Sequence, residues 1–269
     1  MPAMSLSRVL LLSTLFGCSG LALAAANTTE LRQTGDANDG RVTQNGDRLS
    51  ASITQEATRS AAWIEQQGAD NQAVLYQMNR DSLAVIRQEG ALNTAQISQQ
   101  GSLDFDGNLS QVGNGNSATL EQTGGPSGEY VSAGLIQIGN DNQLTVTQRG
   151  SSAINVSQDG DRNVQTLSVS GRRNNISNAS RGNDNRIDIS QDGELLSAGA
   201  QQIGDNNLVT IEQTGLGVWT PAGPDGILYP AAYVYQNGNA NQVALTQRDA
   251  NTAFLTQNGN GNSMTVNQR

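Results

Sequence analysis

The stretch QVGNGNSATLEQ, from Gln111 to Gln122, decides the fold. Its first part, GNGN, is turn chemistry, because Gly and Asn accept positive φ and Asn side chains bond nearby backbone groups. Its second part alternates with period two, the signature of a half-buried strand. One face of that strand carries Asn116, Ala118, Leu120 and Gln122, and the other carries hydroxyl or charged residues. The stretch therefore predicts a short strand with an amide at each end of its inward face.

The same template, Q-x-G-x-x-N-x-φ-x-φ-x-Q with φ apolar, recurs along the chain at a step of eleven residues. Weaker copies without the Gly mostly alternate with strong ones, so the full repeat is about twenty-two residues. Twenty units run from Gln33 to Gln268, with degenerate anchors at Val169 and Ser180. Strands this short cannot bury an apolar face alone, so two units should form one rung of a coil. The chain is predicted to be an all-β, single-domain β-solenoid of about ten two-strand rungs.

The recurring amides are the candidate functional residues. An unpaired buried amide costs about 1–3 kcal/mol, but in a stack each amide can bond to the same amide in the next rung. The inward ladder residues are predicted to be Gln66, Asn71, Gln77, Gln88, Asn93, Gln99, Gln111, Asn116, Gln122, Gln137, Asn142, Gln148, Asn185, Gln191, Gln202, Asn207, Gln213, Gln236, Asn241, Gln247, Gln257, Asn262 and Gln268. The matching turn glycines are Gly68, Gly90, Gly113, Gly139, Gly204, Gly238 and Gly259.

Residues 1–26 have the features of a cleaved secretory signal peptide. Arg8 provides the positive start, a short apolar run follows, and small residues lead to cleavage near Ala24 or Ala26. The single Cys, Cys18, lies in this segment, so a disulfide scaffold is not expected; a lipoprotein processing site at Cys18 is a weaker alternative. The repeat domain should cover residues 27–269. Two stretches exceed the step and contain Pro, which predicts loop insertions at about 123–135 and 214–234.

Composition disfavours several functions. A net charge of -9 argues against nucleic acid as a partner. The chain has no His and only the leader Cys, so an enzyme, a cofactor site or a metal site is not expected. The Asp positions in the turns wander, unlike those of calcium-binding nonapeptide repeats. An ice-binding face would need one regular Thr column, and Thr119, Thr145, Thr147 and Thr246 are expected not to share a position.

Position by position, the units at Gln66–Gln77 and Gln111–Gln122 resemble the curlin repeat of curli fibre subunits. The resemblance covers about Gln33 to Arg269, with more repeats than curli subunits usually have. It implies export through a dedicated outer-membrane pore and polymerisation with itself and other curlin subunits into cell-surface amyloid fibres. It also implies adhesion to host or abiotic surfaces and a place in the biofilm matrix. The ending Val266-Asn267-Gln268-Arg269 and the scattered Arg look more like the minor, nucleating subunit than the major one.

The main alternative is a monomeric surface β-solenoid adhesin that does not polymerise. Such a protein needs capped ends, and the last unit runs to Gln268 with no cap visible in the sequence. An open sheet edge is a template for another strand, which favours self-assembly. The interruptions at Val169 and Ser180, together with Arg172 and Arg173, are interpreted as gatekeepers that slow premature aggregation.

Overall fold

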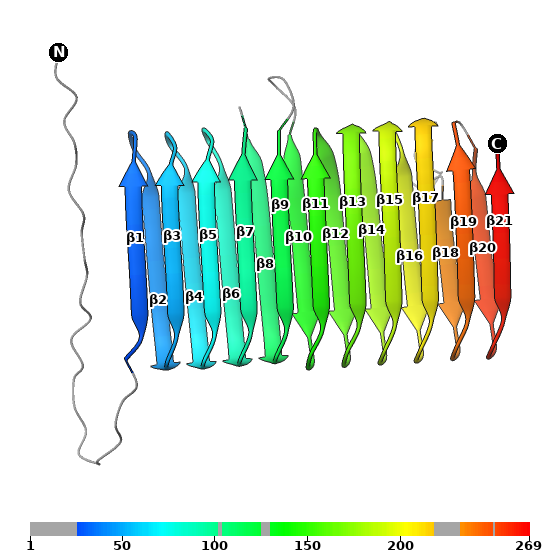
Figure 1. Ribbon diagram of the computed structural model, residues 1–269, viewed down its shortest axis with the longest axis horizontal. Coiled ribbons are helices and arrows are strands. Elements are labelled where there is room, and N and C mark those ends of the chain that lie inside the picture. Colours follow the sequence, from blue (N-terminus) through cyan, green and yellow to red (C-terminus); the bar gives the residue numbers. More distant parts are fainter. Residues whose placement is uncertain (1–25, 102–103, 125–129, 218–231, 250) are drawn as a thin grey trace, which may run out of the picture.

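The computed structural model describes residues 26–101, 104–124, 130–217, 232–249 and 251–269. Two flat parallel sheets face each other and the chain alternates between them, so that each pair of consecutive strands makes one turn of a coil (Figure 1). One sheet has 11 strands and the other 10, which gives about ten turns. The prediction of a β-solenoid with about 22 residues per rung is confirmed.

The first sheet contains the odd-numbered strands in sequence order, β1 (Thr28–Thr34), β3 (Ser50–Glu56), β5 (Gln72–Met78), β7 (Thr94–Gln100), β9 (Ser117–Thr123), β11 (Gln143–Arg149), β13 (Val164–Arg172), β15 (Arg186–Glu194), β17 (Leu208–Leu216), β19 (Gln242–Arg248) and β21 (Ser263–Gln268). The second sheet contains β2 (Asp39–Asp47), β4 (Ala61–Ala69), β6 (Leu83–Ala91), β8 (Phe105–Asn114), β10 (Val131–Ile138), β12 (Ser152–Asp159), β14 (Asn174–Arg181), β16 (Ser197–Ile203), β18 (Ala232–Asn237) and β20 (Ala253–Asn258).

The two edges of the solenoid differ. At the regular edge, where the chain passes from the second sheet to the first, the turns are the G-x-x-N segments, such as 113–116. At the irregular edge, where it passes from the first sheet to the second, the corresponding inward corner holds unlike residues, for example Ser82, Phe105 and Leu196. The alternation of strong and weak sequence units is therefore an alternation between two edges.

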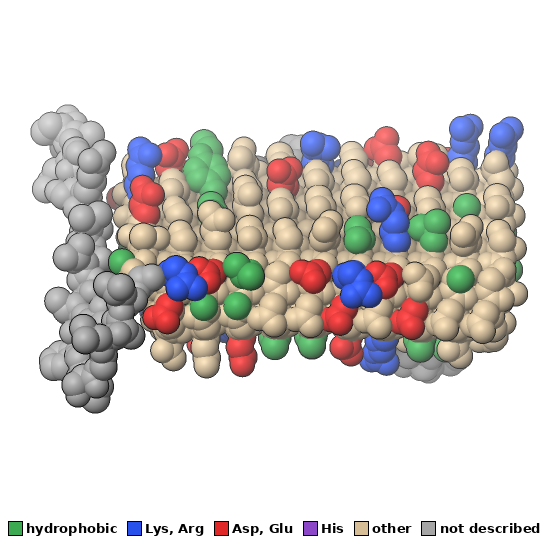
Figure 2. All heavy atoms as spheres, turned by 60° about the horizontal axis from the view of Figure 1, so that its bottom comes forward, with side chains coloured by type: hydrophobic (Ala, Val, Ile, Leu, Met, Phe, Trp, Pro, Cys, Tyr) green, Lys and Arg blue, Asp and Glu red, His purple; other side chains and the backbone are tan. Residues whose placement is uncertain are grey.

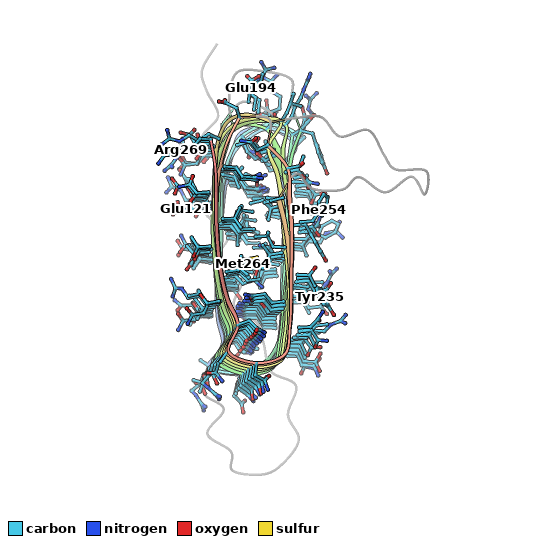
Figure 3. All side chains as sticks on the ribbon, turned by 90° about the vertical axis from the view of Figure 1, so that its right-hand side faces the viewer. Glu121, Glu194, Tyr235, Phe254, Met264 and Arg269 are labelled. Carbon is cyan, nitrogen blue, oxygen red and sulfur yellow. The ribbon has the colours of Figure 1, made fainter. Side chains whose placement is uncertain are left out.

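The core is a thin double layer of inward side chains. Period-two alternation places Ala118, Leu120 and Gln122 inside, each at most 1% exposed, and Glu121 outside. Outward side chains are mainly small and polar, with charged and apolar residues scattered among them (Figure 2). Seen along the solenoid axis, Met264 points between the sheets, while Glu121 and Phe254 point outward from opposite sheets (Figure 3).

The strands that flank both expected insertions meet the irregular edge, and they extend into the expected ranges. The expected range 123–135 was too wide, because Thr123 ends β9 and β10 begins at Val131. The range 214–234 was too wide as well, because β17 runs to Leu216 and β18 begins at Ala232. The physical reason is the register of the ladders. Strands align at their Gln residues, so each strand also pairs over the residues that precede its Gln. Residues 125–129 and 218–231 lie outside the described residues.

The expected signal peptide also lies outside the described residues, apart from its last position. Within the part of the chain that the structure describes, no helix is long and apolar enough to cross a bilayer.

Candidate functional site: the stacked amide ladders

Each sheet contains a ladder of Gln side chains, with one Gln in every rung except that of β13 and β14. The Nε2 of one Gln donates to the Oε1 of the Gln in the next rung, for example Gln77 to Gln99 and Gln99 to Gln122, both at 2.9 Å. In the second sheet Gln88 donates to Gln111 and Gln111 to Gln137, both at 2.8 Å. These distances are those of ordinary hydrogen bonds, although the donors and acceptors are almost fully buried.

The second Nε2 hydrogen of these glutamines is also used. Gln99 donates to the backbone oxygen of Leu83 at 3.2 Å, and Gln111 donates to that of Thr94 at 3.0 Å. Each amide therefore bonds to the next rung and to the strand that faces it. This arrangement removes the cost of burying an amide and links the two sheets within a rung.

The Asn ladder runs along the regular edge. The backbone N–H and the Nδ2 of Asn93 donate to Oδ1 of Asn71 at 2.9 and 3.1 Å, and Nδ2 of Asn93 also donates to the backbone oxygen of Gly113 at 2.8 Å. Asn116 repeats these bonds one rung further on. The Asn side chain thus holds the turn of its own rung to the turns of the neighbouring rungs by hydrogen bonds.

The turn glycines are required by two independent constraints. Gly113 has φ of 119°, in the left-handed region that favours glycine. A Cβ on Gly113 would lie 1.9 Å from the backbone oxygen of Gly139 in the next rung. The other predicted turn glycines share the positive φ: Gly68, Gly90, Gly139, Gly204, Gly238 and Gly259. The Gly of the Q-x-G-x-x-N template is therefore required by the close stacking of one rung on the next.

The structure brings the predicted ladder residues together in three columns. Those at most 4% exposed are Gln66, Asn71, Gln77, Gln88, Asn93, Gln99, Gln111, Asn116, Gln122, Gln137, Asn142, Gln148, Asn185, Gln191, Gln202, Asn207, Gln213, Gln236, Asn241, Gln247 and Gln257. Asn262 is exposed and Gln268 is half-buried, because they belong to the last rung. Both still bond to the rung before, through Asn241 and Gln247.

Comparison with known families agrees with this geometry. Residues 25–56 and 182–215 match the family model of the curlin associated repeat. These two segments are similar to the curlin associated repeat. The first match covers β1 to β3 and the second covers the turn before β15 and most of β15 to β17, so each spans more than one turn of the solenoid. No curated protein matches the chain.

Further residues occupy the same columns and were absent from the predicted set, among them Gln33, Gln44, Gln55, Gln158 and Asn163. Gln55 and Gln158 are fully buried in the Gln ladders, and Asn163 donates to Oδ1 of Asn142 at 3.1 Å. The sequence could have predicted Gln158 and Asn163, because QDGDRN at 158–163 matches the Q-x-G-x-x-N part of the template.

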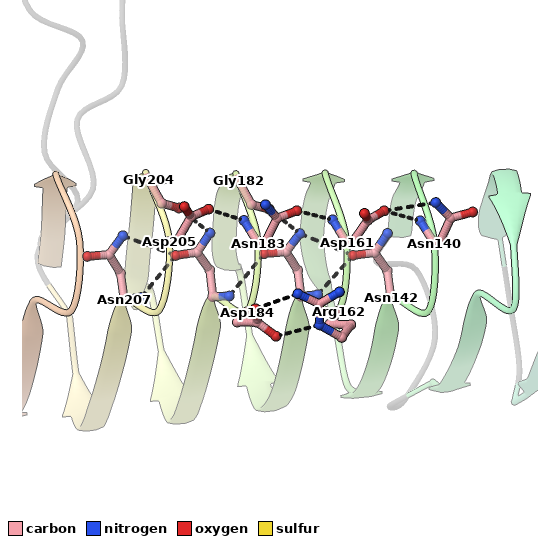
Figure 4. Close-up of polar contacts among 12 residues, drawn as sticks. Asn140, Asn142, Asp161, Arg162, Gly182, Asn183, Asp184, Gly204, Asp205 and Asn207 are labelled. Atoms are coloured by element: carbon pink, nitrogen blue, oxygen red, sulfur yellow. Dashed lines mark hydrogen bonds and ion pairs between the residues drawn. The ribbon is translucent and has the colours of Figure 1, made fainter.

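The sequence reasoning also missed a ladder on the outer side of the regular edge. The residue after the turn glycine accepts a backbone N–H from the rung before it: Asn140 donates to Oδ1 of Asp161 at 2.8 Å and Asp161 to Oδ1 of Asn183 at 2.9 Å (Figure 4). Asn183 in turn donates to Asp205 at 2.7 Å. This outer ladder consists of Asn114, Asn140, Asp161, Asn183, Asp205, Asn239 and Asn260. The sequence did indicate this ladder, because the position after the turn glycine is always Asn or Asp from Asn114 onward.

Exposed ion pairs join neighbouring rungs at the corners. Arg162 holds Asp184 through two bonds of 2.8 and 2.7 Å, and Arg48 holds Asp70 in the same way. The hydrogen bond from Arg162 lowers the pKa of Asp184, and that from Arg48 lowers the pKa of Asp70. The four side chains are 32–56% exposed, so solvent screens these pairs and they contribute little stability.

Four aromatic residues lie in or beside the second expected insertion. Trp219 and Tyr229 lie outside the described residues, whereas Tyr233 and Tyr235 belong to β18. Tyr233 donates to Gln201 at 3.1 Å. Tyr235 and Phe254 face outward on the second sheet (Figure 3).

The expectation that Thr residues share no position was wrong. Thr145 pairs with Thr119 on one side and Thr166 on the other, which gives a short Thr column on the first sheet. Asp188 follows in that column and interrupts it. Among the described residues there is no group of three or more His, Cys, Asp or Glu that could hold a metal ion.

Proposed function

We propose that the chain is a structural subunit of extracellular curli-type amyloid fibres. The observation that supports this most directly is the repetition of the same contacts from rung to rung. Most rungs present parallel backbone groups, Gln amides and Asn amides in register with the rung before them. A surface that accepts an identical surface within one chain can accept it from a second chain.

The edge strands of the described structure match one another in chemistry. Gln33 in β1 and Gln268 in β21 occupy the same ladder column, and Gln44 in β2 and Gln257 in β20 occupy the other. Stacking the first rung of one copy on the last rung of another would continue both sheets and both ladders with unchanged polarity. Such a head-to-tail contact does not close on itself, so it produces a filament.

The match of two segments to the curlin associated repeat supports a wider role. We propose secretion through the outer-membrane curli export pore and polymerisation with itself and other curlin subunits. Adhesion to host or abiotic surfaces and a contribution to the biofilm matrix belong to the same proposal. We favour the minor, nucleating subunit over the major one because Arg is scattered through the repeats and the chain ends in Val266-Asn267-Gln268-Arg269. Nucleic acid is not proposed as a partner because the net charge is -9.

Assembly can be tested on the mature chain purified without denaturant. Thioflavin T fluorescence should rise after a lag, and aligned fibres should diffract at about 4.7 Å along the fibre axis. A chain that stays monomeric, with no such reflection, would instead be the monomeric surface adhesin.

The subunit assignment needs a separate experiment. A nucleating subunit added at a small molar fraction should shorten the lag of a major curlin subunit. A bulk subunit should co-polymerise without changing that lag, and this outcome would reverse the assignment.

A further inference from the structure

The rung formed by β13 and β14 departs from the pattern of its neighbours. Val169 takes the Gln position of the first sheet, paired with Gln148 and Gln191, and Ser180 takes that of the second sheet. Both substituted side chains are at most 1% exposed. The two Gln ladders are therefore interrupted in the same rung, and this rung is the subject of the inference.

The interruption at Val169 leaves polar atoms unpaired. Oε1 of Gln191 is buried and receives no hydrogen bond, because the residue before it in the column has no donor. On the other side of the gap, Nε2 of Gln148 donates to the backbone oxygen of Ser152 at 2.6 Å. The first-sheet ladder therefore ends at Gln148 and starts again at Gln191.

The volume of the core explains why Val is present. One column of the second sheet contains Gly107, then Ala133 and, two rungs after Ala133, Ile176. Gly107 lies against the Gln99–Gln122 hydrogen bond, and a Cβ there would be 3.0 Å from Nε2 of Gln99. A small residue in that column leaves room for a Gln. Ile154 and Ile176 follow Ala133 in that column, and their larger side chains favour a residue smaller than Gln, here Val169, at the ladder position.

In the second sheet, the hydrogen bonds of Ser180 involve an amide of the opposite strand. Gln165, in a column of apolar residues, donates to Oγ of Ser180 at 3.1 Å, and Ser180 donates to Oε1 of Gln202 at 3.2 Å. At this rung the side-chain amide that bonds in the second-sheet column is therefore that of Gln165, which belongs to β13 of the first sheet. The repair is incomplete, because Oε1 of Gln165 and Nδ2 of Asn178 have no partner although both residues are at most 5% exposed.

Unpaired buried atoms gather in this region. Of the six buried side-chain polar atoms without a partner among the described residues, four lie in β12 to β15: Ser152 Oγ, Gln165 Oε1, Asn178 Nδ2 and Gln191 Oε1. In a solenoid each rung contacts only its neighbours, so a poor rung weakens the stack locally. Local weakness of this kind sets where a protein opens without unfolding globally.

We propose that the β13–β14 rung is a built-in weak plane at which the solenoid opens first. It separates a block of β1 to β12 from a block of β15 to β21. The proposal concerns the single chain and does not depend on fibre formation, so its failure would leave the proposed function unaffected.

Hydrogen–deuterium exchange of the full mature monomer, read by mass spectrometry, tests the weak plane. Peptides that cover β13 and β14 should exchange about tenfold or more faster than peptides that cover β9 and β11, since that factor corresponds to one unsatisfied buried polar group. Equal protection of the two regions overturns the proposal.

Two variants locate the cause. The quadruple variant Val169→Gln, Ile176→Ala, Gln165→Val and Ser180→Gln restores Gln at both ladder positions of the rung and should reduce the excess exchange. The single variant Gln99→Val transplants the interruption and should create a second fast-exchanging region at β7. If the quadruple variant does not fold, the transplant decides: an unchanged exchange rate at β7 means that ladder interruption does not cause opening.

Discussion

Removal of one ladder amide should cost far more stability than removal of its neighbour in sequence. Gln99 is fully buried, whereas Gln100, the next residue on the same strand, is exposed. The pair Gln99→Ala and Gln100→Ala therefore compares the same chemical change inside and outside the core.

The magnitude follows from the bonds that are lost. Gln99→Ala removes the acceptor of Gln77 Nε2 and the donor of Gln122 Oε1, both at 2.9 Å. Gln77 keeps its bond to the backbone oxygen of Ala61 at 3.1 Å, but Oε1 of Gln122 is left without a donor. One orphaned buried acceptor costs about 1–3 kcal/mol. The cavity left by the shortened side chain adds about 1–2 kcal/mol, so we expect a total of about 3 kcal/mol.

Urea unfolding of the monomer, followed by circular dichroism, measures the difference. For a slope near 3 kcal/mol per molar urea, Gln99→Ala should lower the midpoint by about 1 M. Gln100→Ala should change the free energy of unfolding by less than about 0.5 kcal/mol. Equal effects of the two substitutions, or a loss below about 1 kcal/mol for Gln99→Ala, would refute the claim that the ladders hold the rungs together.

Three further predictions concern the regular edge. Gly113→Ala should destabilise the monomer by more than about 3 kcal/mol because the added Cβ meets backbone, whereas Gly261→Ala, with φ of 67° and open space around its Cβ position, should cost about 1 kcal/mol in the same urea assay. Asn183→Asp keeps the acceptor of the outer ladder but places a third carboxylate between those of the rungs before and after it. Its melting temperature should therefore fall at pH 7 and recover at pH 3 or in 1 M salt; a loss unaffected by pH and salt would contradict the charge argument. Because the Arg162 bond lowers the pKa of Asp184 in the folded state, its contribution is present above the unfolded pKa and is lost as pH falls through the folded pKa; Asp184→Asn should flatten the acid side of the stability–pH curve, and an unaltered curve would mean that the pair is not formed in solution.

Much of the candidate site was predictable because the repeat places equivalent residues at a fixed step. Gln111 and Gln122 are one step apart in sequence and lie at opposite edges on opposite sheets, while residues two steps apart, such as Gln99 and Gln122, bond directly. Period-two alternation then decides which residues face inward, and amides can repeat as buried polar residues in a stack because each has both a donor and an acceptor. The outer ladder of Asn and Asp was missed because turn residues have local explanations, and nothing local shows that a turn accepts hydrogen bonds from the rung before it.

The sequence by itself determined the step, the strand faces, the turn glycines and the number of rungs, because each depends on local periodicity and backbone conformation. Only the tertiary structure decided how the two edges differ, where the insertions begin and how the core adjusts when a ladder residue changes. These depend on volume shared between strands that are distant in sequence: Ile176 and Val169 fit together, as do Gln165 and Ser180, and neither pair is visible from one strand alone. The amides that first appeared as a regular letter pattern are therefore a continuous bonded column in most rungs and an interrupted one at β13–β14.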